Sequence, residues 1–61
     1  MYITHFKTVD GKTEDYYYWS AKEAMNHMKL FADDDSGLYE EITVEDEDDG
    51  KIYGKITFRE A

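Results

Sequence analysis

Hydrophobic and polar residues alternate in four stretches of the chain, and this alternation predicts four β-strands. The strands are expected at residues 2–9, 12–19, 38–46 and 51–59. A short segment containing Asp-Gly, a dipeptide typical of tight turns, joins the members of each pair: Asp10-Gly11 in the first and Asp49-Gly50 in the second. The chain therefore predicts two β-hairpins.

The first hairpin is expected to turn through two residues, because Asp-Gly suits a two-residue turn. This register places Lys7 opposite Glu14 and Tyr2 opposite Trp19. An ion pair and an aromatic pair across the strands both favour it.

The second hairpin requires a different loop, because facing residues of an antiparallel pair lie on the same side of the sheet. A two-residue turn would set Val44 against Lys55. We expect Ile42 and Val44 to face the apolar side of the last strand instead, which consists of Ile52, Gly54, Ile56 and Phe58. The loop must then have an odd number of residues, either three (48–50) or five.

The segment between the hairpins predicts one helix at residues 21–32. Ser20 and Glu23 have the spacing of a capping box, and Trp19 is placed to pack on Ala24 as a hydrophobic staple. Apolar residues recur at helical spacing: Ala21, Ala24, Met25, Met28, Phe31 and Ala32. Three consecutive aspartates at 33–35 are unfavourable at a helix C-terminus and should end it.

The expected fold class is α+β. It is a small ββαββ domain in which a four-stranded antiparallel sheet, made of two hairpins, carries one helix packed on one face. The 61 residues form a single domain, 1–61. A chain of this size buries only about 60% of its unfolded surface, which leaves little room for a preformed pocket. The order of the strands in the sheet stays open.

Composition limits the classes of function. The chain has no cysteine, which excludes disulfides and thiolate metal sites. The N-terminal segment lacks the pattern of a signal peptide, and no apolar run is long enough to span a bilayer. Ten aromatic residues oppose disorder. We expect a folded, soluble, cytoplasmic protein without membrane attachment.

Acidic residues dominate the charge. Fifteen acidic and seven basic side chains give a net charge of −8, and residues 33–49 hold ten acids and no base. Two interpretations of this run are open: it keeps a small protein soluble, or it docks on a basic partner. The candidate binding residues are Glu41, Glu45, Asp46, Glu47, Asp48 and Asp49. In the docking interpretation, strand carboxylates about 6.6 Å apart could imitate phosphates, whereas direct nucleic-acid binding is opposed by the like charge.

Catalysis and metal binding are not indicated. The acidic loops fail the EF-hand spacing, because position twelve counted from Glu45 is Ile56. His5 and His27 fall on different elements, and His27, which lies off the apolar stripe, is expected at the surface. No triad, phosphate loop or zinc spacing occurs. The sequence predicts neither an enzyme nor a cofactor.

The aromatic run at residues 16–19 is the second candidate binding feature. We expect Tyr17 and Trp19 to face the helix. Four tyrosines would then lie on the uncovered face of the sheet: Tyr16, Tyr18, Tyr39 and Tyr53. Alternation alone also permits the opposite assignment. Such an aromatic face would serve as a protein-contact surface or as the interface of a homodimer.

These features together predict a non-catalytic, acidic protein-binding module. Its partner would be a larger protein with a basic, nucleic-acid-handling surface, and binding would inhibit that protein. In size, acidity and lack of a catalytic motif the chain resembles small phage-encoded inhibitors of host defence, including anti-CRISPR proteins. The alternative is a self-associating structural protein, or an accessory or regulatory protein of a bacterial operon or mobile element, without inhibitory action.

Overall fold

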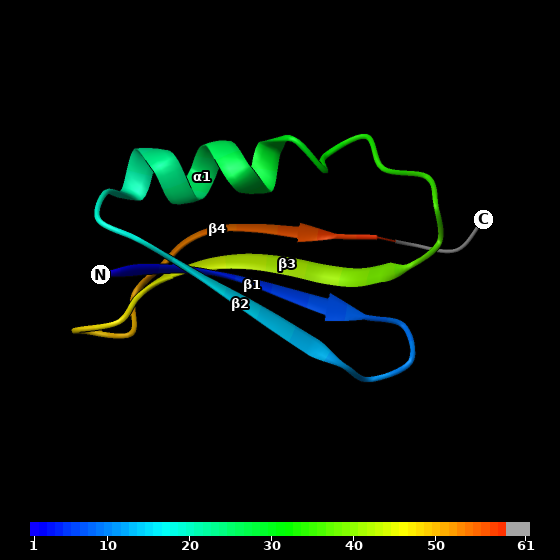
Figure 1. Cartoon of the computed structure of the whole chain (residues 1–61), viewed down its shortest axis with the longest axis horizontal. Coiled ribbons are helices and arrows are strands. Elements are labelled where there is room, and N and C mark those ends of the chain that lie inside the picture. Colours follow the sequence, from blue (N-terminus) through cyan, green and yellow to red (C-terminus); the bar gives the residue numbers. More distant parts are fainter. Residues whose placement is uncertain (59–61) are drawn as a thin grey trace.

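The chain folds as two strands, a helix and two strands (Figure 1). The computed structural model describes residues 1–58, so residue 59 of the last predicted strand lies outside the described part. The elements are β1 (Tyr2–Thr8), β2 (Thr13–Tyr18), α1 (Ala21–Lys29), β3 (Tyr39–Asp46) and β4 (Ile52–Thr57). This arrangement confirms the predicted α+β fold.

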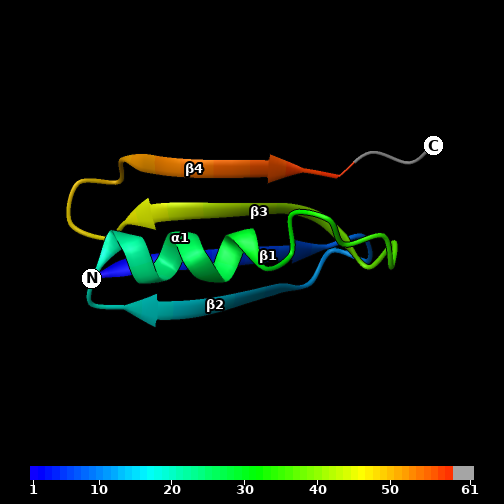
Figure 2. The ribbon, with the colours of Figure 1, turned by 90° about the horizontal axis from the view of Figure 1, so that it is seen from above.

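The four strands form one antiparallel sheet in the order β2-β1-β3-β4. The two hairpins are joined through β1 and β3, which are therefore the central strands, while β2 and β4 form the edges. Seen from above, α1 runs over the middle of the sheet (Figure 2). Its N-cap is Ser20, as predicted, whose Oγ accepts a hydrogen bond from the backbone N–H of Glu23 at 3.2 Å. On the opposite face of the sheet, which we call the open face, residues 1–58 place no helix.

The helix is shorter than predicted. It ends at Lys29, and the chain continues in tighter turns in which the backbone N–H of Phe31 donates to the carbonyl of Met28 at 3.0 Å. These turns still bring Phe31 against the core. The predicted packing of Trp19 on Ala24 is wrong, because Trp19 is 83% exposed.

The first hairpin turns through three residues, 9–11, and not two. The backbone N–H of Thr8 donates to the carbonyl of Lys12 at 2.8 Å, and Gly11 closes the loop with a φ of +89°. A three-residue loop that ends in a left-handed glycine is a common alternative to the two-residue turn. The pairing shifts by one residue, so that Tyr2 faces Tyr18 and the predicted Tyr2–Trp19 and Lys7–Glu14 pairs are wrong.

This shift decides the orientation of β2, because a slip of one residue moves every side chain to the other face of the sheet. In the observed register Asp15 reaches His5 on the open face, and Tyr18 reaches His27 beneath the helix. The orientation that the sequence left as the alternative is therefore the correct one.

The second hairpin turns through four residues, 47–50, so the predicted odd-numbered loop is wrong. The expected pairs nevertheless form, with Ile42 opposite Ile56 and Val44 opposite Gly54. A register shift between Val44 and Glu45 leaves Tyr53 as an extra residue in β4. This extra residue compensates for the even number of loop residues, so that the apolar residues of the two strands still face one another. Beyond the shift Ile52 pairs with Glu45, so it lies on the open face and not on the helix side as predicted.

The core lies between the sheet and α1. Its buried side chains are Phe6, Ala24, Met28, Ile42 and Val44. Thr4 is the buried polar residue, and its hydroxyl donates to the carbonyl of Ala24 at 3.0 Å, which ties β1 to the helix. Within residues 1–58, no helix combines the length and apolar character needed to cross a membrane.

Candidate protein-binding surface

Two of the four tyrosines predicted to face outward lie instead under the helix. The ring of Tyr16 meets Phe6 edge-on, with centroids 5.5 Å apart, and that of His27 at 4.8 Å. The hydroxyl of Tyr18 lies 2.6 Å from Nδ1 of His27. The one-residue shift of the first hairpin explains both positions.

The other two tyrosines are placed on the helix side by shifts in strand register. Tyr39 lies next to the shift between β1 and β3, and its ring centroid is 5.5 Å from those of Phe6 and Phe31. Tyr53 is the extra residue of β4 and meets the ring of Tyr2 at 5.6 Å. The predicted outward aromatic face is therefore wrong, although Tyr16 and Tyr53 remain 41% and 40% exposed at the edges.

His27 is not the free surface histidine that the sequence predicted. Its half-buried ring lies among the rings of Phe6, Tyr16, Tyr18 and Phe31, all with centroids within 5.8 Å. Its helical spacing of four residues from Phe31 was the available sequence signal. Because histidine is polar, it was not counted among the apolar residues that mark the core-facing side of the helix.

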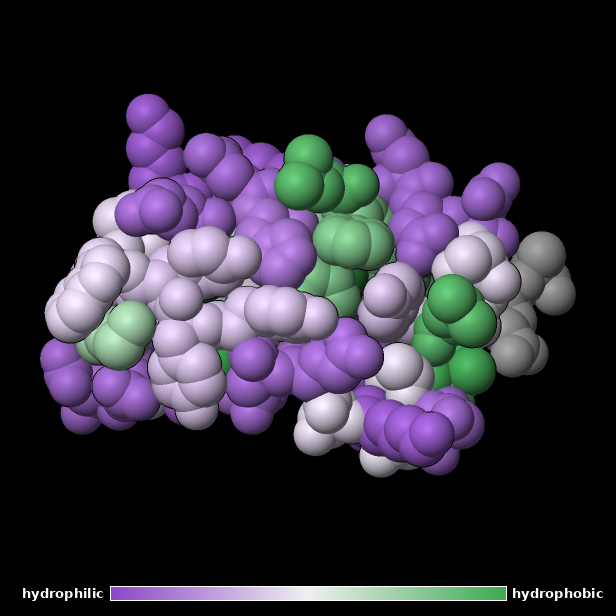
Figure 3. Space-filling view, in the orientation of Figure 1, coloured by the Kyte–Doolittle hydropathy of each residue, from purple (hydrophilic) through white to green (hydrophobic). Residues whose placement is uncertain are grey.

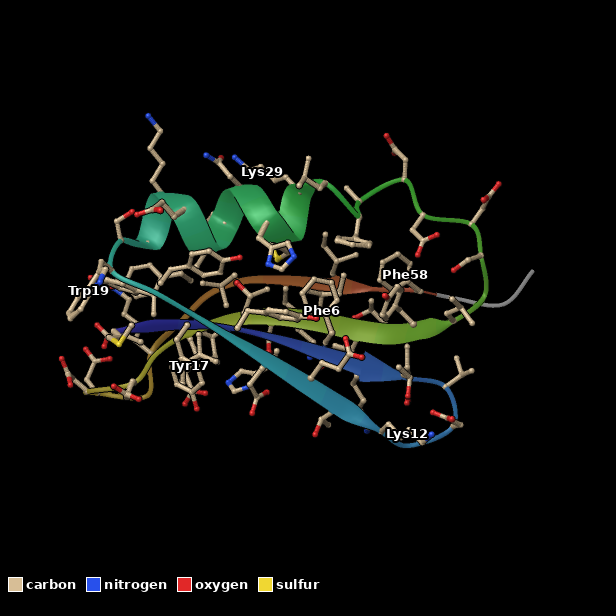
Figure 4. All side chains as sticks on the ribbon, viewed as in Figure 1. Phe6, Lys12, Tyr17, Trp19, Lys29 and Phe58 are labelled. Carbon is tan, nitrogen blue, oxygen red and sulfur yellow. The ribbon has the colours of Figure 1, made fainter. Side chains whose placement is uncertain are left out.

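The two most exposed aromatic residues, Trp19 and Tyr17, are at one end of the molecule. Trp19 and Tyr17 are 83% and 53% exposed, and both lie near the end of the sheet that carries the β3–β4 hairpin (Figure 4). Ile52, 51% exposed, belongs to the same row across the open face as Tyr17. We call Tyr17, Trp19 and Ile52 the end patch. The space-filling view shows a weakly polar area over this end, whereas the helix surface is strongly hydrophilic except for a hydrophobic area at its C-terminal end (Figure 3).

The β3–β4 loop brings acidic residues to the same end. We call Asp46, Glu47, Asp48 and Asp49 the acidic tip. Asp46 Oδ1 accepts from the backbone N–H of Asp48, and Asp49 Oδ1 accepts from that of Lys51, each at 2.9 Å. These two aspartates therefore build the turn. Glu47 lies 3.7 Å from the N-terminal ammonium. Among residues 1–58, no three His, Asp or Glu side chains are grouped so that they could hold a metal ion.

The two strand acids of the predicted set are separate from the tip. Glu41 pairs with Lys55 at 3.5 Å, and Glu45 pairs with Nε2 of His5 at 2.8 Å. Both carboxylates are on the open face, but each has a basic partner within the chain. The structure therefore weakens the idea that Glu41 and Glu45 continue a phosphate-like row from the tip.

The other acidic segment is remote from the tip. Residues 33–35 lie in the turn after α1, at the opposite end of the molecule (Figure 1). Asp34 is used there to accept hydrogen bonds from the backbone N–H and the hydroxyl of Ser36, both at 3.0 Å. The continuous acidic stretch of the sequence is thus divided between two ends of the fold.

His5 occupies the middle of the open face between two carboxylates. Its Nδ1 lies 2.6 Å from Oδ1 of Asp15 on β2, and its Nε2 lies 2.8 Å from Oε1 of Glu45 on β3. Because a carboxylate only accepts hydrogen bonds, this geometry requires both ring nitrogens to carry protons. Partial burial by itself lowers the pKa of His5, but the hydrogen bonds and charges of the two carboxylates outweigh it, so the pKa is raised above its ordinary value of 6.5. No sequence pattern indicates this cluster, because its members are distant along the chain.

The fold and this surface define a small ββαββ domain with an acidic and aromatic end. Comparisons with protein-family models, with curated proteins and with solved structures found no match. A function for the chain must therefore be inferred from its own surface.

Proposed function

We propose that this chain is a non-catalytic protein-binding domain that docks through its acidic tip and end patch on a basic surface of a larger protein. The observation that carries the proposal is that the most exposed aromatic side chain, Trp19, lies at the same end as the acidic loop (Figure 4). Exposed Trp and Tyr supply most of the binding energy in many interfaces. Carboxylates at the rim steer a basic partner and fix its orientation.

The partner class follows from charge. Basic protein surfaces of nucleic-acid-handling proteins bind the phosphates through Lys and Arg. A domain with a net charge of −8 that covers such a surface would compete with nucleic acid and inhibit the partner, as an anti-CRISPR-like protein does. The chain itself is not expected to bind nucleic acid or a cofactor. A cytoplasmic location suits a chain without cysteine.

A double charge reversal tests the docking surface. Glu47→Lys with Asp48→Lys leaves Asp46 and Asp49, whose carboxylates hold the turn, in place. We expect this variant to bind the partner at least about tenfold more weakly, which corresponds to ~1.4 kcal/mol. The partner is first captured from lysate, purified and shown to bind nucleic acid, and its affinity for each variant is then measured by calorimetry at two salt concentrations.

The matched control is Asp33→Lys with Asp35→Lys at the opposite end of the molecule, where Asp34 is left in place. Both double variants change the net charge by the same amount, from −8 to −4. The control should retain most of its affinity. Equal weakening by both would mean that only net charge matters, and no weakening by either would exclude the acidic tip from the interface.

The end patch gives a separate prediction. Tyr17→Ala with Trp19→Ala should leave the melting temperature nearly unchanged, because both side chains are more than half exposed. The affinity for the partner should fall by about tenfold or more. Val9→Ala with Leu38→Ala removes a similarly exposed apolar pair, joined by a backbone hydrogen bond of 3.0 Å, and serves as the control. A large loss of stability in the aromatic variant would show that the patch is structural.

Self-association remains the second candidate, because β2 and β4 are edge strands and edges pair readily with other strands. If it is correct, light scattering should show a dimer at micromolar concentration. The aromatic variant would then become monomeric, and no stoichiometric partner would be captured.

A further inference from the structure

The His5 cluster bridges three strands of the sheet. β2 is an edge strand that pairs only with β1, and its side chains are exposed from Thr13 to Tyr17. His5 on β1 is hydrogen-bonded on one side to Asp15 of β2 and on the other to Glu45 of β3. The imidazolium therefore links the edge strand to the centre of the sheet through two charge-assisted hydrogen bonds.

A neutral imidazole cannot keep both contacts. It has one N–H and one lone pair, and the lone pair would face a carboxylate oxygen less than 3 Å away. One of the two carboxylates must then turn away from the ring. Asp15 is the more exposed of the two, with 42% of its side chain accessible against 33% for Glu45. Since Asp15 also lies on the edge, it is the contact that is given up.

The other charged groups on the open face do not supply the positive charge that His5 loses when it becomes neutral. On β1 itself, Lys7 is directed to Glu40, 3.7 Å away. From the β3 and β4 side, Lys55 is directed to Glu41. On β2, the neighbour of Asp15 on this face is the exposed Tyr17, and opposite His5 on β3 is the uncharged Thr43. Protonation of His5 is therefore the event that sets the charge within this cluster.

We propose that His5 is a pH-sensitive latch that holds edge strand β2 to the sheet when it is protonated and releases Asp15 when it is neutral. The direction of the pH dependence follows from the linkage between proton binding and folding. A group whose pKa is raised in the folded state contributes stability in full below its unfolded pKa, here 6.5, and this contribution is lost as the pH rises through the folded pKa. The latch is thus closed in mildly acidic solution and open in alkaline solution. It does not depend on the proposed docking function.

The test uses the isolated chain. Nitrogen-detected NMR of the histidine rings between pH 5 and pH 9 gives the pKa of His5, and hydrogen exchange gives the protection factors of the β2 and β3 amides at the two ends of this range. We expect a pKa above 6.5, and β2 protection that falls with rising pH by about tenfold for each unit by which the pKa is raised. The amides of β3 should change less.

Two variants on β2 separate the latch from any other pH-dependent change in the chain. Asp15→Asn removes the latch carboxylate, so the pKa of His5 should fall and the pH dependence of β2 protection should be largely lost. Glu14→Gln makes the same charge change one residue away, at a carboxylate that accepts from the Tyr16 hydroxyl at 3.1 Å and does not contact His5. It should behave as the unchanged chain does. A pKa of His5 at or below 6.5, or equal pH dependence in both variants, would overturn the proposal.

Discussion

Replacing Phe6 with alanine is expected to unfold a large fraction of the protein at room temperature. Phe6 is 1% exposed, and its ring contacts those of Tyr16, His27, Phe31 and Tyr39 at centroid distances between 5.0 and 5.5 Å. Truncation of a buried phenylalanine costs about 3–5 kcal/mol. A chain of this length has a total stability of only about 3–9 kcal/mol, at roughly 0.05–0.15 kcal/mol per residue.

Urea unfolding followed by circular dichroism measures this effect, with the fraction folded in the absence of urea as the main readout. Leu30→Ala is the control, because Leu30 is 80% exposed and its truncation should cost no more than about 0.5 kcal/mol. If Phe6→Ala shifts the free energy of unfolding by less than about 1 kcal/mol, the aromatic cluster is not the centre of the core.

Replacing Gly54 with valine is expected to destabilise the protein by about 1–3 kcal/mol through overpacking. An added Cβ at Gly54 would lie 2.7 Å from Sδ and 2.9 Å from Cε of Met25, and 2.9 Å from Cε of Met28. Met28 is buried and has little freedom to move, so the two further methyl groups of valine have no space. The helix lies this close to β4 because the sheet presents no side chain there.

The compensating change is Met25→Ala, which removes the atoms nearest to the new Cβ. We expect the double variant Gly54→Val with Met25→Ala to be more stable than the Gly54→Val variant, as measured by thermal unfolding. Gly54→Ala should cost less than Gly54→Val, since the contacting atoms are the flexible ends of methionine side chains. A failure of Met25→Ala to restore any stability would mean that the cost lies in the β4 backbone and not in the contact with the helix.

The acidic stretch shows how far a candidate site can be predicted from sequence. Counting charges correctly identified an acidic loop in the second hairpin, because a run of five acids is almost never fully buried. It could not show that Asp46 and Asp49 build the turn, or that Glu45 is paired with His5, since these roles depend on backbone geometry and on a strand 40 residues away. Asp48, and Glu47 with its 46% exposed side chain beside the N-terminal ammonium, are the members of the predicted set that the structure leaves best placed to meet a partner.

The sequence by itself determined the order of the elements, the start of the helix at Ser20 and the core residues Ile42 and Val44. These features follow from local patterns: a two-residue period in strands, a helical period between them and a capping serine. Only the tertiary structure decided the register of the first hairpin. Asp10-Gly11 fits a loop of two or of three residues, and the choice between them depends on contacts such as those of Asp15 and Tyr18 with side chains outside β2. Because one residue of register exchanges the two faces of a strand, that choice set the position of every tyrosine in β2 and created the His5 cluster.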